Sequence, residues 1–366
     1  VFLKSPREHI GRWALLTAIT FALLLLNTLS PFLITTLILA GSAVLSVAVG
    51  SVFIPLPTLW DVLGSALKGS ASTLDPDGVY LKIITDLRLP RMLMLALVGA
   101  ALAGSGGAYQ GLFRNPLADP FLIGVSSGAG LGAVLAMLVK SPYTSAGLLA
   151  VPLAAFTGAL LTVLVVAMLA RVGKTVPTTN LILAGVAVSS FTSAVTSALM
   201  IHSTGELRRA LVWLMGGAIM SGWSPILGML PYMVIALSGL VMIGHPLNVL
   251  QFGEEQAQQL GIRVQRVRWI TISLATLATA AAVAFAGIIG FVGLVIPHII
   301  RLLWGGDYRR LLPLSMLGGA SLLLLTDVVA RSIIAPQEIP VGIVTALLGA
   351  PFFLWILKIS KAQNYW

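Results

Sequence analysis

The sequence predicts an all-α polytopic membrane protein, with about ten transmembrane helices in a tight, glycine-rich bundle. Of its 366 residues, 58% are hydrophobic and only 9% are charged, whereas about a quarter of the residues are charged in soluble domains. The mean hydropathy is +1.00. Because about 20 apolar residues cross the hydrocarbon layer, the chain can supply roughly ten spans and little soluble mass.

Uncharged runs mark the spans, because a charge at the bilayer centre costs about 2.5–3.5 kcal/mol. These runs cover residues 13–60, 92–113, 120–139, 141–170, 175–205, 210–253, 269–300, 311–326 and 339–357. Prolines divide the run 210–253, which predicts a re-entrant or interfacial helix near 206–217 and a span near 224–244. Glycines and Pro297 divide the run 269–300 into spans near 267–287 and 290–304.

The run 13–60 is ambiguous, because it fits two spans or one span near 33–53 that follows an interfacial helix. The balance of basic residues favours ten spans with the amino terminus inside, because basic residues are enriched on the inner side. That orientation places on the inner side Lys4, Arg7, Arg12, Arg114, Arg171, Lys174, Arg263, Arg266, Arg268, Arg301, Arg309, Arg310, Lys358 and Lys361. The outer side then has the smaller set, Lys68, Lys82, Arg88, Arg91, Lys140, Arg208, Arg209 and Arg331.

Small residues indicate how the spans pack. Gly124, Gly128 and Gly132 recur every four residues, and so do Gly107 and Gly111. Small residues at this spacing form a stripe on one helix face and allow two backbones to approach closely.

Composition and spacing exclude several kinds of site. The chain has no cysteine and four scattered histidines, so we expect no metal site and no cofactor in this chain. Gly173-Lys174-Thr175 resembles the end of a phosphate-binding loop, but Met168 stands where the first glycine is required. We therefore expect no nucleotide site. The formal charge of +10 is assigned to membrane topology, and no nucleic-acid partner is expected.

Two other functions are alternatives. Residues 124–128 match the G-x-S-x-G pattern of serine hydrolases, and His298 could assist Ser126, but glycines at helical spacing favour packing. Asp327 is an acidic residue in a late apolar run, as in proton-coupled carriers. Arg331 lies four residues later on the same helix face, so a local ion pair is the simpler interpretation.

The loop 245–268 is the longest inner connection. Within it, residues 253–261 predict a short helix that has acidic residues in its first turn and ends at a glycine. An ordinary loop helix is the alternative, but a membrane protein that receives work from a soluble partner needs a contact element of this kind.

Several segments resemble the FecCD-type permeases, the membrane subunits of binding-protein-dependent ABC importers for iron-siderophore complexes, haem and cobalamin. These segments are LRLPRMLMLALVGAALAGSGGAYQGLFRNPLADPFLIGVSSGAGLGAV (87–134), LILAGVAVSS (181–190), GEEQAQQLGI (253–262), GFVGLVIPHIIRLL (290–303), DYRRLLPLS (307–315) and IPVGIVTALLGAPFFLWIL (339–357). The resemblance covers about residues 33–360.

The resemblance implies a permease domain over residues 33–362, preceded by a cytosolic or interfacial extension over 1–32. It implies a second permease copy, two cytosolic ATP-binding subunits that bind ATP and Mg, and an extracytoplasmic substrate-binding protein. This chain would then catalyse no covalent chemistry and have no catalytic residue. The membrane would be the cytoplasmic (inner) membrane of a bacterium or archaeon.

The resemblance also implies roles for individual residues. Residues that would couple to the ATPase are Gly253, Glu254, Glu255, Gln256, Ala257, Leu260 and Gly261, with Glu254, Glu255 and Ala257 on the contact face. Arg88, Arg91 and Arg331 would receive acidic residues of the binding protein, and the alternative is that they anchor helix ends. Thr178, Thr179 and Asn180 would form the cytosolic gate.

The cargo is expected to be an iron chelate, either haem or a ferric siderophore, and cobalamin is the alternative. Met215, Met220, Gly216 and Gly217 near the outer mouth are compatible with all of these. His202, Arg208 and Arg209 could contact haem, although ordinary loop residues are the simpler interpretation.

Overall fold

The structure, a computed structural model, describes residues 30–50, 52–68, 72–139, 145–173, 175–201, 207–218, 220 and 222–363. Most of the predicted extension 1–32, the possible span 13–32, Lys174 and His202 therefore lie outside the described residues. The regular elements of the described residues are helices, and one isolated bridge joins Val172 to Thr175.

Ten helices correspond to the ten predicted spans. They are α2 (Pro31–Ala48), α5 (Leu89–Phe113), α6 (Val125–Leu138), α7 (Ser145–Leu169), α8 (Thr178–Ile201), α10 (Ser224–Met242), α13 (Val264–Ala286), α14 (Val292–Trp304), α15 (Tyr308–Ser332) and α16 (Val341–Gln363). Seven are long and apolar enough to cross a membrane, while α6, α14 and the apolar part of α16 are shorter. The predicted all-α, polytopic fold is confirmed.

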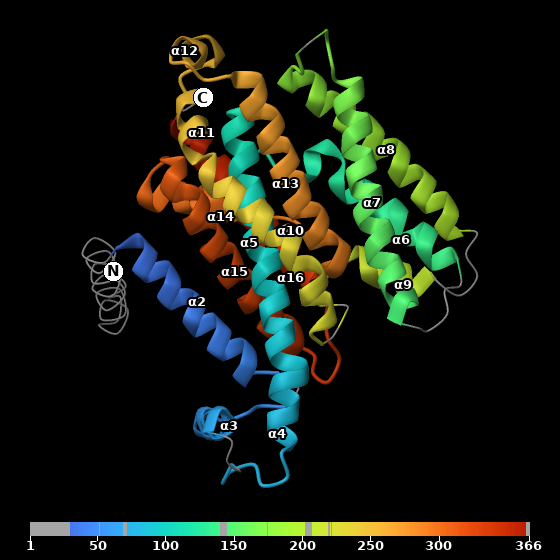
Figure 1. Cartoon of the computed structure of the whole chain (residues 1–366), viewed down its shortest axis with the longest axis vertical. Helices are drawn as coiled ribbons and strands as arrows, with labels where there is room; N and C mark the ends of the chain where they lie inside the picture. The colour runs from blue at the N-terminus through green and yellow to red at the C-terminus, as the bar shows by residue number, and fades with distance from the viewer. Residues whose placement is uncertain are drawn as a thin grey trace, which may run out of the picture.

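The remaining helices are short and connect the spans. They are α3 (Leu56–Lys68), α4 (Val79–Lys82), the π-helical turn η1 (Ile83–Arg88), the 3-10 turn η2 (Pro120–Ile123), α9 (Leu207–Leu214), α11 (Gly244–Leu250) and α12 (Glu254–Gln259). In Figure 1, α12 lies at one extreme of the bundle, and α3 and α4 lie at the opposite extreme. We call these extremes the α12 end and the α3 end.

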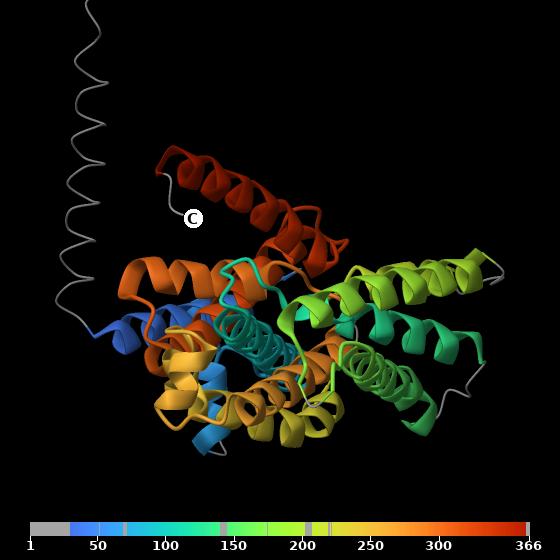
Figure 2. The same ribbon diagram turned by 90° about the horizontal axis from the view of Figure 1, so that it is seen from above.

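Helix α5 is the centre of the bundle, and Figure 2 shows it nearly end-on among its neighbours. It packs against α15, α13, α14 and α10, and its span is 72% buried. Helices α6, α7 and α8 form a second group beside it, while α16 extends away from the bundle. The least buried long spans, α8 and α2, present apolar side chains outward, as expected of a lipid-facing surface.

Glycines make the closest helix contacts. A methyl group on Gly99 of α5 would overlap the backbone of Gly319 of α15. The predicted stripe is confirmed for α6, because Gly128 and Gly132 pack directly against the backbone of α7. Gly124 instead precedes α6 at φ +88, a conformation that favours glycine. Such contacts allow backbones to meet without intervening side chains.

Three boundaries differ from the predicted ones. Helix α15 extends past the uncharged run 311–326, because the charge of Asp327 is paired inside the bundle. Helix α13 begins at Val264 because buried Arg268 finds partners at its first turns. The loop 245–268 is partly helical, since α11 occupies its first residues and packs on α15 and α5.

The α5–α15 contact generates a stability prediction. Gly99→Val should destabilise the bundle by about 1–3 kcal/mol, because overpacking displaces the two backbones. Gly41→Val in α2 is the matched control, because Gly41 has open space around its Cα. Thermal unfolding of the detergent-purified protein measures both variants. Equal melting temperatures for the two variants would contradict this account of the packing.

Candidate functional site

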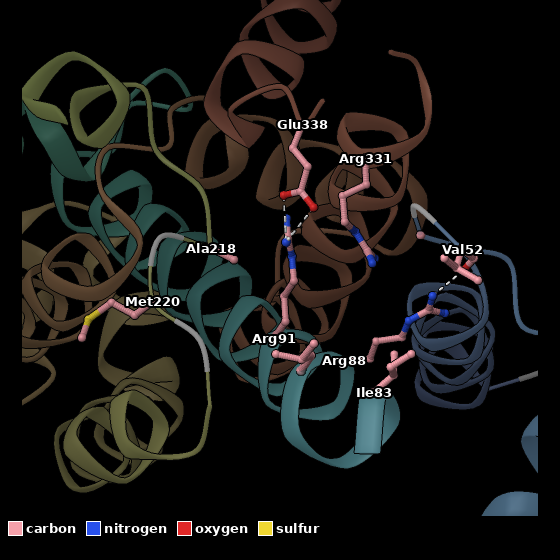
Figure 3. A pocket seen from close by; sticks show the side chains of 10 residues that line it. Val52, Ile83, Arg88, Arg91, Ala218, Met220, Arg331 and Glu338 are labelled. Carbon is pink, nitrogen blue, oxygen red and sulfur yellow. Dashed lines mark hydrogen bonds and ion pairs between the residues drawn. The ribbon is translucent and has the colours of Figure 1, made fainter. Parts of the chain in front are cut away.

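Three arginines line one cavity at the α3 end of the bundle. Arg88 is the last residue of η1, Arg91 lies in the first turn of α5, and Arg331 lies in the last turn of α15. The cavity has a volume of about 280 Å³ and is shown in Figure 3. Its other lining residues are Gly50, Val52, Ile83, Leu87, Ala218, Met220 and Glu338. The structure thus brings together the three arginines that the sequence singled out.

Two of these arginines cap helix α2. Arg88 donates hydrogen bonds to the carbonyl oxygens of Val47, Ala48 and Val52, and only 7% of Arg88 is exposed. Arg331 donates to the carbonyl oxygen of Ser46 over 3.0 Å. The last carbonyls of a helix have no partner within the helix and attract positive charge. Arg88 and Arg331 therefore anchor the end of α2, which is the alternative role considered for them.

Asp327 connects two of the arginines. Its carboxylate is fully buried and lies 2.8 Å from Nη2 of Arg91 and 2.9 Å from Nε of Arg331. The predicted ion pair between Asp327 and Arg331 is confirmed. With both oxygens next to guanidinium groups, Asp327 has the surroundings of a structural ion pair, which argues against a proton-carrying role.

Arg91 is the arginine that faces the surface. It is 20% exposed, and its Nη1 lies 2.9 Å from Glu338, whose side chain is 46% exposed. In the whole cluster, three positive charges face two negative ones, so one positive charge is in excess. A carboxylate from another molecule could therefore bind in the cavity if it replaced Glu338 as the ion-pair partner of Arg91.

The α12 end presents the predicted loop helix. Helix α12 starts after Gly253, at φ +111, and ends at Gln259, two residues before Gly261, at φ +83. The N–H of Gly261 donates to Gln258 and that of Ile262 to Ala257, both over 2.9 Å, which is the glycine C-cap that the sequence predicted. The exposed residues of the segment 253–261 are Glu255, Gln256, Gln258, Gln259, Leu260 and Gly261.

Ala257 corrects one expectation. It was expected on the contact face of the helix, but its side chain is fully buried against the bundle. A small side chain at this position lets α12 lie close to α11 and α13, on which it packs. Ala257 therefore packs α12 against the bundle. Glu255 is the exposed acidic residue in the first turn of α12.

A set of hydrogen bonds that the sequence did not predict holds α11, the helix before α12, against α15 and α5. Asn248 of α11 donates to Asp307 over 2.6 Å and accepts from the N–H of Tyr308 over 2.7 Å. Hydrogen bonds from Arg309 and Asn248 hold the pKa of Asp307 well below its usual range. Gln251 reaches the carbonyl of Gly111 in α5 over 2.9 Å. The sequence signal was Asp307 itself, an N-cap residue directly before α15.

The three predicted gate residues form the first turn of α8. Thr178 and Asn180 are half-buried, and Thr179 is exposed. Two residues earlier, the carbonyl of Val176 accepts a hydrogen bond from Arg268 of α13, which also binds Glu254 of α12. Sequence reasoning counted Arg268 only as an inner basic residue. The gate role of residues 178–180 stays a prediction.

The hydrolase pattern has a packing role in the structure. Ser127 donates to the carbonyl of Gly124 over 3.1 Å, and Gly128 packs on α7. Among the hydrogen bonds of the described residues, none joins Ser126 to His298. The segment 124–128 begins a transmembrane helix.

This architecture is that of a polytopic helical membrane protein with an exposed polar helix at one end and a charged cavity at the other. Comparisons with known proteins agree. The FecCD transport family matches residues 13–358, so this chain belongs to the FecCD transport family. The match also includes residues 13–32, which belong to the predicted extension.

Two named relatives are also permease proteins. The chain is 42% identical over 276 residues to the cobalamin import system permease protein of Halobacterium salinarum, covering 75% of this chain and 73% of the relative. It is 38% identical over 316 residues to the hemin transport system permease protein of Yersinia pestis, covering 82% and 93%. This chain is thus a membrane-spanning transport permease subunit.

A solved structure shares the fold. It shows an inward-facing conformation of an ABC transporter assigned to the metal-chelate type, with a TM-score of 0.77 and 35% identity. The match covers 88% of this chain and 97% of the other. The ten-helix arrangement of the described residues is therefore that of an ABC permease.

The ion-pair cluster generates a second stability prediction. Asp327→Asn should destabilise the protein by about 3–5 kcal/mol, because it leaves a buried guanidinium without a counter-charge. Adding Arg331→Gln should restore part of the loss, because it removes that uncompensated charge.

Glu338→Gln is the control for this prediction. Its side chain is 46% exposed, so the loss should stay below about 1 kcal/mol. Melting temperatures of the purified proteins measure all three variants. If Asp327→Asn melts together with the control, the buried carboxylate has no structural role.

Proposed function

We propose that this permease works in an ATP-driven, binding-protein-dependent importer for an iron chelate, either haem or a ferric siderophore. The observation that supports the proposal most directly is α12, a capped helix with a polar exposed face at one extreme of an otherwise apolar bundle. Such a helix offers a water-soluble partner a rigid contact, and its buried Ala257 fixes it to the bundle.

The proposal includes the partners of the permease. Two cytosolic ATP-binding subunits contact α12 and bind ATP and Mg, and this chain pairs with a second permease copy as a homodimer or pseudo-dimer. The α12 end then faces the cytosol, and the α3 end faces the binding protein. The membrane is the cytoplasmic membrane of a bacterium or archaeon.

The cavity at the α3 end is the proposed docking site of the binding protein. Arg91 is the most exposed of the three arginines and is the one best placed to meet an acidic side chain. Arg88 and Arg331 add positive potential to the cavity, while their N–H groups remain bonded to backbone carbonyls of α2. At an exposed site this attraction mainly affects orientation and association rate. Thr178, Thr179 and Asn180 are proposed to close the pathway at the cytosolic side.

The cargo assignment is supported by the named relatives and the solved structure. The hemin permease and the metal-chelate transporter favour an iron chelate. The cobalamin permease favours the alternative, the same type of permease carrying a corrinoid. The absorbance spectrum of the cognate binding protein, purified from its host, distinguishes haem, a ferric siderophore and a corrinoid.

The first functional prediction concerns α12. In proteoliposomes with the cognate ATP-binding subunit and binding protein, Glu255→Arg together with Leu260→Asp should lower ATP-driven uptake by at least about tenfold, because both residues lie on the exposed face. Uptake of hemin, ferric citrate or cyanocobalamin is the measurement. Arg310→Gln, an exposed residue outside α12, should leave uptake within about twofold of wild type. Uptake without ATP in the wild type would exclude an ABC importer.

A second functional prediction concerns the docking cavity. Glu338→Gln should strengthen binding of the cognate binding protein about two- to fivefold at low salt, because it frees Arg91 for a partner carboxylate. Arg91→Gln should weaken binding. Both effects should shrink as salt is added, because exposed charges are screened.

The matched control for docking is Asp86→Asn, an exposed acidic residue near the start of α5 that does not line the cavity. Its affinity should equal that of the wild type. Binding of the labelled binding protein to the permease complex in nanodiscs measures all three variants. Weaker binding by Glu338→Gln would show that this carboxylate helps docking and would contradict the proposed competition.

A further inference from the structure

Arg268 of α13 is a buried charge at the α12 end of the bundle. It lies one turn inside the helix, and its side chain is only 5% exposed. A buried guanidinium is costly unless its N–H groups find partners. The partners that Arg268 finds come from two parts of the chain that are distant in sequence.

The two ends of the guanidinium bind different elements. Nη1 donates to the backbone carbonyl of Val176 over 2.8 Å, and Nη2 donates to the carboxylate of Glu254 over 2.5 Å. Glu254 is the first residue of α12. Val176, whose own side chain is 1% exposed, lies two residues before α8.

These elements otherwise pack in separate groups. Helix α12 packs on α11 and α13, whereas α8 packs mainly on α6 and α7. The guanidinium of Arg268 therefore bridges the contact helix and the segment that leads into the predicted gate. Because the guanidinium is planar and rigid, it fixes the relative position of its two acceptors, which a lysine ammonium cannot do.

We propose that Arg268 is a positioning residue that transmits the displacement of α12 to the first turn of α8. When the partner subunit shifts α12, Glu254 moves with it, and the bond to Val176 displaces the backbone that precedes Thr178. This inference rests on the proposed function of α12 and residues 178–180. It adds the residue that links them.

The test separates transmission from a purely structural role. The full complex of permease, ATP-binding subunit and binding protein is reconstituted, and uptake is divided by ATP hydrolysed. Hemin, ferric citrate and cyanocobalamin are the cargo probes. Arg268→Gln should keep the ATP-binding subunit bound and hydrolysis within about twofold, yet lower uptake per ATP by at least about tenfold. Arg268→Lys should behave in the same way, because it retains the charge without the planar fork.

A second readout follows the gate directly and needs no cargo. Because the chain has no cysteine, Thr179→Cys gives a single reactive site in the first turn of α8. In the wild-type background, its labelling rate by a charged thiol reagent should change when ATP replaces ADP. With Arg268→Gln, labelling should continue but lose its dependence on nucleotide.

Matched variants complete the design. Arg266→Gln removes an exposed charge from the same helix and should keep wild-type uptake per ATP. Glu254→Ala breaks the bridge from the other side, at a side chain that is 43% exposed, and provides the test if Arg268→Gln does not fold. If the bridge is one unit, the double variant should be no worse than Arg268→Gln alone.

The outcomes are distinct. Wild-type uptake per ATP in Arg268→Gln or Glu254→Ala overturns the proposal, and so does a parallel loss of hydrolysis and uptake, which indicates a docking defect. Nucleotide-dependent labelling that survives in Arg268→Gln also overturns it. Failure of the proposed function would appear separately, as a wild-type complex that shows no ATP-dependent uptake of any probe and no labelling response.

Discussion

The rest of the structure depends on the close approach of α5 to α15. Gly99 and Gly319 let the two backbones touch, and α5 thereby becomes an axis that α13, α14 and α10 can surround. In a membrane, lipid tails compete with side chains for apolar contact, so helix association depends on this kind of packing. The start of α5 and the end of α15 are held at one level as a result, which brings Arg91 within reach of Asp327.

In the described part of the chain, the buried charges lie at the two ends of the bundle, and each has a partner there. At the α3 end, arginines from α5 and α15 share Asp327 and cap α2. At the α12 end, Arg268 takes one acceptor from α12 and one from the segment before α8. Breaking a buried pair is much more costly than its net contribution to stability, so these groups fix the relative positions of helices from different parts of the chain.

Much of the fold could be predicted from the sequence, because hydropathy and glycine spacing are local properties. The ten spans, the break near Gly287 and the glycine cap of α12 were all predicted. Properties that depend on tertiary partners could not be predicted. The uncharged run ends before Asp327, and its local partner Arg331 could be predicted from the spacing, but its second partner, Arg91, is 236 residues away and could not. Burial of Ala257 and the two acceptors of Arg268 likewise depend on which helix faces which.

Helices α6 and α14 have a consequence for the depth of the membrane. With 14 and 13 residues they extend only about 20 Å, whereas the hydrocarbon layer is about 30 Å thick. Each starts after a residue with positive φ, Gly124 and Phe291 respectively, so irregular backbone lies within the thickness of the bilayer. Such backbone is tolerated there only against protein or water. The irregular backbone around Gly124 and Phe291 must therefore face protein or water inside the bundle and not the surrounding lipid.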